Sequence, residues 1–367
     1  MRVVLLTSIM APHRIAPFNA LAAMPGIDLT VIYLAVTDPT RTWDTHVEEI
    51  RFRHVVLREH ARRRRDETYV HLVSGLTATV RSARPDVMVI GGWDQPSYLQ
   101  AFVRALSHRV PVLWWVESTL RDHRNSGGLV RWMKSWLIDH ASGSVVPGAA
   151  SREYVLTLGA NPARIWTAPN AVDNKRFRRS TERGNDEGEP TRFLFVGRLV
   201  SGKGLLYLLD AWSRLRGPGH LTIAGNGPLA AAIRMRVATT SMNPVELVGN
   251  LDRAELADAY RTADAFVFPT LTDVWGLVIN EAMSAGLPII TTDVPGAVDD
   301  LVTDGDNGVV VPALESEPLV RAMDWLGGDR ELRQSMGRRS AERIRGFEPE
   351  AWADGMANAI HSAKAGR

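Results

Sequence analysis

Short apolar runs alternate with longer amphipathic stretches along most of this chain. In the first half, five apolar runs of strand length are separated by segments whose apolar residues recur at helical spacing. Parallel strands buried on both faces read as continuous apolar runs, so the pattern indicates β-α-β units. The predicted strands are 3–6, 29–33, 87–90, 112–116 and 144–146, and the predicted helices are 16–23, 72–84, 96–107 and 129–140.

The alternation breaks at residues 170–190, where basic residues precede a Gly- and acid-rich stretch, and then resumes. The second series predicts strands at 193–196, 221–224, 245–248, 265–268, 288–292 and 309–311, and closing helices at 331–345 and 349–363. We therefore predict an α/β protein of two doubly wound, Rossmann-like, parallel-sheet domains. The expected boundaries are 1–172, a linker at 173–190, 191–346, and a C-terminal helix at 347–367 that returns to the first domain.

Composition and charge narrow the functional classes. The chain has 367 residues and no cysteine, which excludes a disulfide scaffold, a thiolate metal site and a catalytic thiol. No run resembles a signal peptide or a membrane span, so a cytoplasmic location is expected.

Residues 1–170 carry 20 Lys/Arg and 14 Asp/Glu, a net charge of +6, whereas residues 171–367 carry a net charge of −4. This asymmetry suits an anionic membrane surface or acceptor beside the first domain, although ordinary solubility charge explains it equally well. The Arg62–Arg65 run reads as a solvated loop, with an anion contact as the alternative.

The first site with chemical character follows the predicted strand at 193–196. Its sequence, from Gly197 to Gly204, is a glycine-rich turn that feeds a helix and contains Arg198 and Lys203. Free backbone N–H groups at a helix start bind anions, and two cations add to them. The turn therefore predicts a diphosphate site. It almost spells a Walker A loop, but Gly204 stands where the magnesium-binding Ser/Thr would be, which makes an NTPase the weaker interpretation.

The second site lies between the strand at 265–268 and the next helix. Asp273 precedes a helix start near Gly276, and Glu281 lies inside that helix with its side chain leaning toward the N-terminal end. Carboxylates accept hydrogen bonds from hydroxyls, so two of them beside an anion site predict a sugar or ribose ligand.

Together these two sites resemble the C-terminal domain of the family 4 retaining glycosyltransferases, which have the GT-B fold. The family's E-x(7)-E motif corresponds to Asp273 through Glu281, with Asp in place of the first Glu. Further matches are Val196-Gly197-Arg198, Lys203-Gly204, Ala224-Gly225-Asn226-Gly227-Pro228 and Pro169-Asn170-Ala171-Val172-Asp173. The resemblance implies two domains that face each other across a cleft.

The resemblance also implies roles in transferring a hexose-type sugar from a UDP or GDP donor. Arg198 and Lys203 would bind the diphosphate with the amides near Gly276 and Leu277, and Glu281 would bind the ribose. Asp273 would hold the transferred sugar. Gly197, Gly225 and Asn226 would line the donor pocket. The reaction would need no metal, no cofactor and no nucleic acid, and would serve surface polysaccharide or glycoconjugate synthesis with a saccharide, lipid-linked or small-molecule acceptor.

The acceptor half matches the family in architecture and only weakly in motif. The loop after the first strand has no glycine, and Glu117 follows a strand after which the family often has histidine. Arg14, Asp94 and Glu117 each follow a strand at its carboxyl end, where ligands of such sheets bind. We therefore predict that these three residues and His123 contact the acceptor or the sugar, with Glu117 as a fourth catalytic candidate beside Asp273, Arg198 and Lys203.

Three further patterns are open to simpler explanations. Asp304-Gly305-Asp306 precedes a strand and is typical of a tight turn more than of a metal site. Trp132 and Trp136 share a helix face, which favours packing. The alternatives to a transferase are a nucleotide-sugar epimerase, whose acid/base set we do not find, and a two-domain sugar-binding protein, which does not need Arg198 with Lys203.

Overall fold

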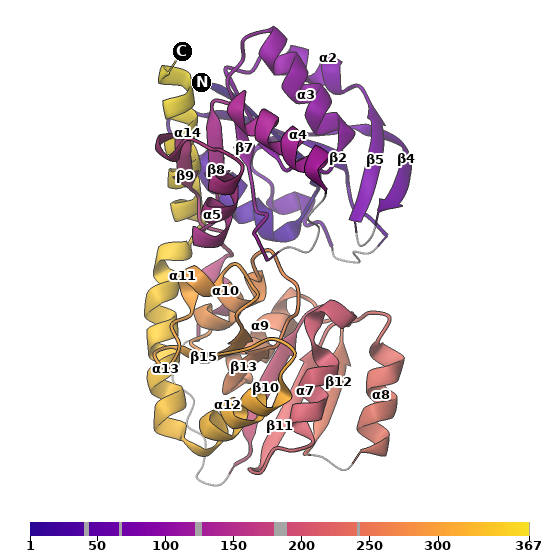
Figure 1. Ribbon diagram of the computed structural model, residues 1–367, viewed down its shortest axis with the longest axis vertical. Helices are drawn as coiled ribbons and strands as arrows, with labels where there is room; N and C mark the ends of the chain where they lie inside the picture. Colours follow the sequence, from indigo (N-terminus) through magenta and orange to yellow (C-terminus); the bar gives the residue numbers. More distant parts are fainter. Residues whose placement is uncertain (40–43, 66–67, 122–126, 180–188, 241–242, 367) are drawn as a thin grey trace. The chain divides into compact units, whose positions relative to one another are not determined.

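The computed structural model describes residues 1–39, 44–65, 68–121, 127–179, 189–240 and 243–366. The chain divides into two compact units (Figure 1). Unit 1 runs from Met1 to Val172, apart from a loop at Arg121, and includes the segment from Phe347 onward; unit 2 runs from Asp173 to Gly346. Each unit is built on one parallel sheet, which confirms the predicted α/β class with two Rossmann-like domains.

Seven parallel strands form the sheet of unit 1. Their order is β3-β2-β1-β6-β7-β8-β9, so the chain reverses direction across the sheet between β1 and β6. The strand bounds are β1 Arg2–Ile9, β2 Asp28–Ala35, β3 Arg53–Val56, β6 Val87–Gly91, β7 Val112–Trp115, β8 Gly143–Val146 and β9 Ile165–Thr167.

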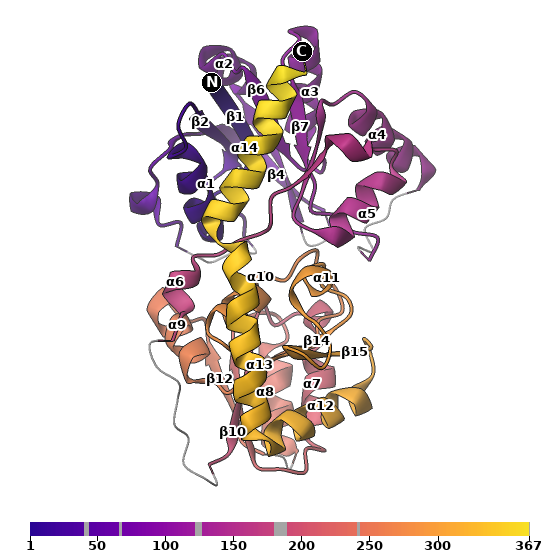
Figure 2. The same cartoon turned by 90° about the vertical axis from the view of Figure 1, so that its left-hand side faces the viewer.

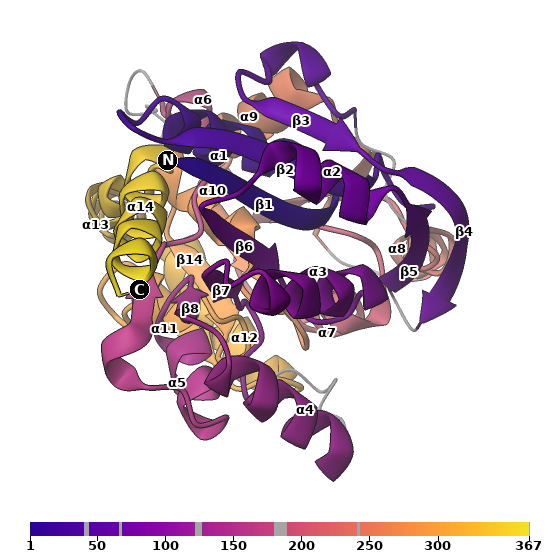
Figure 3. The same cartoon turned by 90° about the horizontal axis from the view of Figure 1, so that it is seen from above.

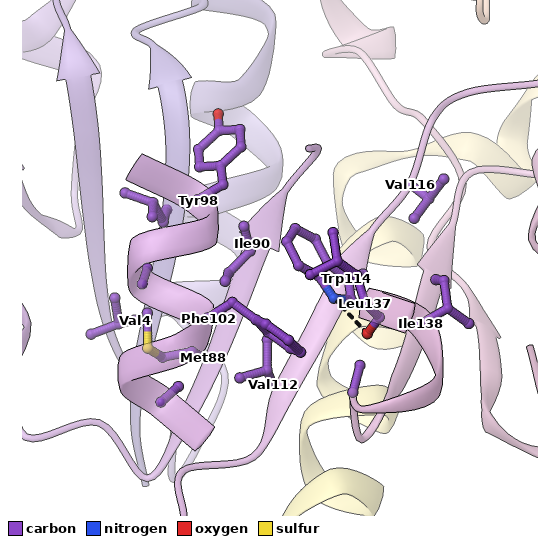
Figure 4. Packing of buried hydrophobic residues seen from close by; sticks show 14 of the residues in the cluster. Val4, Met88, Ile90, Tyr98, Phe102, Val112, Trp114, Val116, Leu137 and Ile138 are labelled. Atoms are coloured by element: carbon purple, nitrogen blue, oxygen red, sulfur yellow. Dashed lines mark hydrogen bonds between the residues drawn. The ribbon is translucent and has the colours of Figure 1, made fainter. Parts of the chain in front are cut away.

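One face of this sheet is covered by helices α2 to α5, and Figure 3 shows α2 and α3 lying along it. Trp114 on β7 is fully buried there (Figure 4). Its ring packs 5.3 Å from that of Phe102, and its indole N–H donates to the carbonyl of Leu137 at 3.2 Å. These helices are α2 Leu76–Ala83, α3 Pro96–Ser107, α4 Gly128–Asp139 and α5 Ala149–Thr157.

Helices α1 (Ile15–Ala22) and α14 (Pro349–Ala365) cover the opposite face of the same sheet, as Figure 2 shows for α14. The ring of Trp352 on α14 lies 5.4 Å from both Phe18 and Trp115. At Gly355 a Cβ atom would come within 2.1 Å of the carbonyl oxygen of Thr167, so the helix can lie this close to β9 only with glycine there. The last helix of the chain thus completes the core of the unit that begins it.

An antiparallel hairpin, β4 (Arg58–Arg65) with β5 (Thr68–Ser74), projects beside the parallel sheet. The arginine run is therefore a strand, and the prediction of a solvated loop was wrong. The predicted helix at 72–84 was also wrong at its start, because β5 runs to Ser74 and α2 begins at Leu76 after Gly75, whose φ is +88°. Cross-strand pairing has given extended structure to a sequence with few apolar residues.

Trp132 and Trp136 share a face of α4 but not an environment. Trp136 packs 6.0 Å from Phe102 and 4.4 Å from His140, whereas Trp132 is 65% exposed. The prediction of packing therefore holds for Trp136 and was wrong for Trp132.

Six parallel strands form the sheet of unit 2, in the order β12-β11-β10-β13-β14-β15. This is the 3-2-1-4-5-6 order of a Rossmann sheet, with its reversal between β10 and β13. The strand bounds are β10 Thr191–Val196, β11 Gly219–Ala224, β12 Val245–Gly249, β13 Ala265–Phe268, β14 Ile289–Thr292 and β15 Gly308–Val311.

Helices pack on both faces of the unit 2 sheet, and one of them lies inside the stretch expected to be linker. That helix, α6 (Asn174–Phe177), packs on α9 and α10. The others are α7 Leu205–Trp212, α8 Ala230–Thr239, α9 Arg253–Thr262, α10 Leu277–Ser284, α11 Val298–Leu301, α12 Ser316–Gly328 and α13 Arg330–Arg343. In the part of the chain that the structure describes, no helix is both long and apolar enough to cross a bilayer.

Candidate active site

The residues predicted to bind the donor lie on loops at the carboxyl end of the unit 2 sheet. One loop joins β10, which ends at Val196, to α7, and another joins β13, which ends at Phe268, to α10. β10 and β13 are neighbours, and the strand order reverses between them. Ligands of doubly wound sheets bind at such a reversal. The topology therefore brings the two predicted sites together.

Two glycines allow these loops to pack backbone against backbone. Gly204 has a φ of +68°, and a Cβ atom there would lie 1.8 Å from the carbonyl oxygen of Pro269. Gly225 has a φ of +130°, and its Cβ would lie 2.0 Å from the carbonyl oxygen of Gly197. Only glycine fits such close approaches at a positive φ. The glycines thus shape the surface that the amides and side chains occupy.

Hydrogen bonds fix the loops to one another. The amide of Thr272 and the hydroxyl of Thr270 both donate to the carbonyl of Gly202, at 3.1 and 3.0 Å. The carbonyl of Asn226, in the loop after β11, accepts from the amide of Leu199 at 2.9 Å. Arg198 is half-buried in the same turn. Three loops therefore form one continuous platform.

Lys203 and Asp273 form an ion pair on this platform. The Lys203 Nζ lies 2.6 Å from Asp273 Oδ2 and also donates to the carbonyl of Thr272 at 3.3 Å. The other oxygen of Asp273 accepts from the amide of Trp275 at 3.2 Å. Both side chains of the pair are 19% exposed. The residues assigned to diphosphate and to sugar are thus in direct contact.

The start of α10 is held rigidly beside that pair. Gly276 precedes the helix with a φ of +95°, and its carbonyl accepts from Ile279 at 2.9 Å. Trp275 is buried, and its indole N–H donates to Asn280 Oδ1 at 2.9 Å. The first amides of a helix, which include that of Leu277, have no partner inside the helix. A preorganised start of this kind can hold an anion.

Glu281 lies in the second turn of α10 and is partly buried. Its Oε2 accepts from the hydroxyl of Tyr260 on α9 at 2.7 Å. Burial raises the pKa of Glu281 to about 7, and the Tyr260 hydrogen bond opposes the rise. Burial, and then the carboxylate beside it, hold the pKa of Tyr260 well above its usual range. Tyr260 was not predicted from the sequence, since its contact depends on how α9 packs against α10.

In unit 1, two of the predicted acceptor residues meet at the carboxyl end of the sheet. Arg14, after β1, lies 2.9 Å from Glu117, after β7. The guanidinium stacks 4.1 Å from the ring centre of Trp115, and the Glu117 carbonyl accepts from Ser151 at 3.1 Å. These contacts hold both charged side chains in place at one end of the sheet.

Asp94 follows β6, the strand beside β1, and is exposed. Its charge contributes to raising the pKa of the buried Tyr98 hydroxyl, after the larger effect of burial, and Arg14 acts in the opposite direction. Asp94 and Arg14 therefore share one neighbourhood. His123 lies outside the described residues.

The Asp304 segment is a turn, as predicted. Asp304 accepts from the amide of Val310 at 2.9 Å, and Gly305 has a φ of +74°. Among the described residues, one group of three potential metal-binding side chains lies close together, namely His46, Glu48 and Glu49 at the surface of unit 1. None of these belongs to the predicted site, and a metal-free reaction stays a prediction.

Two family models match most of the chain. "Glycosyl transferase 4-like domain" covers residues 18–171, and "Glycosyl transferases group 1" covers residues 190–329. Among curated proteins, a glycogen synthase of Mycobacterium tuberculosis is 29% identical over 304 residues, 78% of this chain and 71% of that protein. A sulfoquinovosyl transferase of Arabidopsis thaliana is 30% identical over 232 residues, 60% of this chain and 44% of that protein.

Solved structures show the same fold over the whole chain. Anabaena HepE in complex with UDP has a TM-score of 0.78 at 16% identity, with 99% of this chain and 100% of that chain covered. A sucrose-phosphate synthase of Thermosynechococcus elongatus has a TM-score of 0.77 at 19% identity, with full coverage of both chains. Two Rossmann-like units, together with these family matches, identify a glycosyltransferase with the GT-B fold. The chain belongs to the group 1 glycosyl transferases, which confirms the family expected from the Asp273 to Glu281 motif.

Proposed function

We propose that this enzyme transfers a hexose-type sugar from a nucleotide diphosphate donor, with UDP or GDP as the nucleotide, and keeps the anomeric configuration. The acceptor is a saccharide, a lipid-linked sugar or a small molecule in surface polysaccharide or glycoconjugate synthesis. The complexes of HepE with UDP and with UDP and glucose support a donor of this class. A sugar-binding protein or an epimerase fits the family less well.

The observation that carries the proposal is the Lys203–Asp273 pair beside the start of α10. A cation and a row of helix-start amides suit the two charged phosphates, and a carboxylate suits sugar hydroxyls. Because the pair already exists, a diphosphate that draws Lys203 toward itself leaves Asp273 available to the sugar. Arg198 adds a second cation on the same turn.

In the proposed reaction the acceptor oxygen bonds to the anomeric carbon on the face that the diphosphate leaves. The bond from that carbon to the phosphate oxygen breaks, and its electron pair stays on the diphosphate. The acceptor's proton passes to the leaving phosphate oxygen. Lys203, Arg198 and the amides of α10 stabilise the charge that develops there, so no metal is needed in this scheme.

We expect the reaction to proceed in excess chelator and to keep the anomeric configuration of the sugar. An α-linked donor, chosen by screening UDP- and GDP-sugars for binding, should give an α-linked product. The anomeric proton coupling in the NMR spectrum of the product measures this directly. Donor incubated without acceptor serves as the control for epimerisation.

Two outcomes would contradict this scheme in different ways. A β-linked product would assign the base role to Glu117, a carboxylate on the acceptor side that Arg14 holds in place. Loss of activity in chelator, with recovery on adding Mg²⁺ or Mn²⁺, would show that a metal takes part.

The proposal includes peripheral contact of unit 1 with an anionic membrane through the β4–β5 hairpin. Arg58 and Arg63 are exposed on β4, and Leu72 on β5 is 50% exposed. Arg62 pairs with Glu59 at 2.8 Å and contributes less. Arginines beside an exposed apolar side chain suit the headgroup region of an acidic bilayer.

We expect the protein to sediment with vesicles that contain phosphatidylglycerol and not with pure phosphatidylcholine vesicles. Each arginine near the surface adds about 1 kcal/mol, so Arg58→Glu with Arg63→Glu should abolish most of the binding. The matched control is Arg216→Glu with Arg234→Glu, which reverses two exposed arginines of unit 2. If both double variants sediment equally with the acidic vesicles, the hairpin is not the membrane-binding surface.

A further inference from the structure

Tyr260 is a buried tyrosine with an ordered hydroxyl. Its side chain has no exposed surface, and its ring packs edge-on against Phe177 of α6, with centroids 5.5 Å apart at 87°. Phe266 on β13 lies 5.7 Å away on another side. The ring therefore cannot swing without disturbing the strand and helices around it.

The hydroxyl is directed at one oxygen of Glu281. It lies 2.7 Å from Glu281 Oε2 and 3.4 Å from the carbonyl of Val278, so its single proton belongs to the shorter contact. Within the described residues, the other oxygen of Glu281 has no hydrogen bond. The carboxylate is thus held at one oxygen and open at the other, on a side chain that is partly exposed.

We infer that Tyr260 is a positioning residue for the donor, which fixes Glu281 Oε2 so that Oε1 meets the ribose hydroxyls. The inference rests on the proposed function, in which Glu281 binds the ribose. A carboxylate that is free to rotate would lose side-chain freedom on binding, whereas one already held by Tyr260 loses less. The hydroxyl acts through Glu281 and does not touch the donor.

Local charges leave this arrangement undisturbed. Tyr260 is the titratable neighbour that acts on Glu281, and α10 carries no other charged residue. Several charged groups of the surrounding elements contact other partners. Arg176 pairs with Asp173, Arg261 with Asp258, and Arg339 with Asp306. Arg179 donates to the carbonyls of Tyr260 and Ala263, and Arg343 contacts Thr303 and Asp306.

The test uses Tyr260→Phe, which keeps the ring and removes the hydroxyl. Calorimetry at pH 8 compares UDP and GDP with their 2′-deoxy and 3′-deoxy forms. The wild type should bind UDP or GDP about tenfold more tightly than at least one of the deoxy forms, the scale of one hydrogen bond to a charged group. In Tyr260→Phe this preference should fall at least threefold, whereas Tyr207→Phe, a half-buried tyrosine on α7, should keep it.

The affinity for a sugar nucleotide, measured over a series of pH values, gives a second test. A purely structural role of Tyr260 in packing would not change its pH dependence. The ionised form of Glu281 accepts from ribose, so affinity should fall as the pH drops through its pKa, which lies at about 7. Because the Tyr260 hydrogen bond lowers that pKa, Tyr260→Phe should move the loss of affinity to higher pH. Glu281→Gln should remove the pH dependence of the affinity. Its effect on affinity and that of Tyr260→Phe should not be additive in the double variant.

The outcomes separate the inference from the function it rests on. Nucleotide binding with unchanged ribose preference and pH dependence in Tyr260→Phe would overturn the positioning role and leave the donor class standing. If neither UDP nor GDP binds the wild type, the proposed donor class fails and the positioning role fails with it.

Discussion

Replacing Lys203 with alanine should lower kcat by about 100-fold or more, a loss of roughly 3 kcal/mol of transition-state stabilisation, the scale of removing one preorganised charge-stabilising group. Lys203 stands on a platform of three linked loops, 2.6 Å from Asp273, so only a shift of its side chain is needed to bring its charge to the diphosphate. Arg198→Ala should lose a similar amount. Turnover at saturating donor is the measurement, because the charge on the diphosphate develops as the bond breaks.

The controls separate charge on the phosphate from stability. Lys203→Ala leaves the Asp273 carboxylate without its cationic partner, so the variant should also unfold more easily. Lys203→Ala combined with Asp273→Asn removes both charges and should recover stability but not turnover. Lys175→Ala changes an exposed lysine of α6 and should match the wild type. Near-normal turnover in both Lys203→Ala and Arg198→Ala would refute the diphosphate assignment.

Gly204→Ala should destabilise the protein by about 3 kcal/mol and abolish donor binding. The new Cβ would lie 1.8 Å from the backbone oxygen of Pro269, and the residue must keep a φ of +68°. Left-handed backbone costs roughly 1–2 kcal/mol in a residue with a Cβ, and overpacking against backbone costs roughly 1–3 kcal/mol more. Urea unfolding measures the first effect, and nucleotide titration measures the second.

The matched control is Gly305→Ala. Gly305 has a φ of +74°, but a Cβ there meets nothing within 4 Å. The Gly305→Ala variant should therefore lose only the cost of the left-handed backbone, about 1–2 kcal/mol of unfolding free energy, and should bind the donor normally. Equal destabilisation in the two variants would mean that the loop after β13 yields easily, and that the platform is less rigid than its hydrogen bonds suggest.

Most of the fold could be predicted from the sequence because buried parallel strands are continuous apolar runs. β10, β11 and β13 are of this kind, and the glycine-rich turn and the Asp273 to Glu281 spacing follow them directly. The hairpin escaped prediction because β4 consists largely of arginine, and its extended form depends on pairing with β5.

Contacts between distant residues account for what the sequence could not predict at the site. Nothing near Lys203 in the chain indicates that its side chain rests on Asp273, 70 residues later. The hydrogen bond from the Tyr260 hydroxyl to Glu281 likewise forms only because α9 packs on α10. Residue types and loop positions were predictable, whereas pairing between side chains depends on the tertiary structure.

The position of α14 has a consequence for how the protein is made. Its side chains, including Trp352 and Met356, fill the core of unit 1, yet they are translated only after the whole of unit 2. During synthesis residues 1–172 therefore leave the ribosome with one apolar face of their sheet partly uncovered, whereas unit 2 from Asp173 to Gly346 is one uninterrupted stretch of the chain. Unit 1 can therefore complete its core only after unit 2 has been synthesised, and until then its uncovered apolar surface favours aggregation.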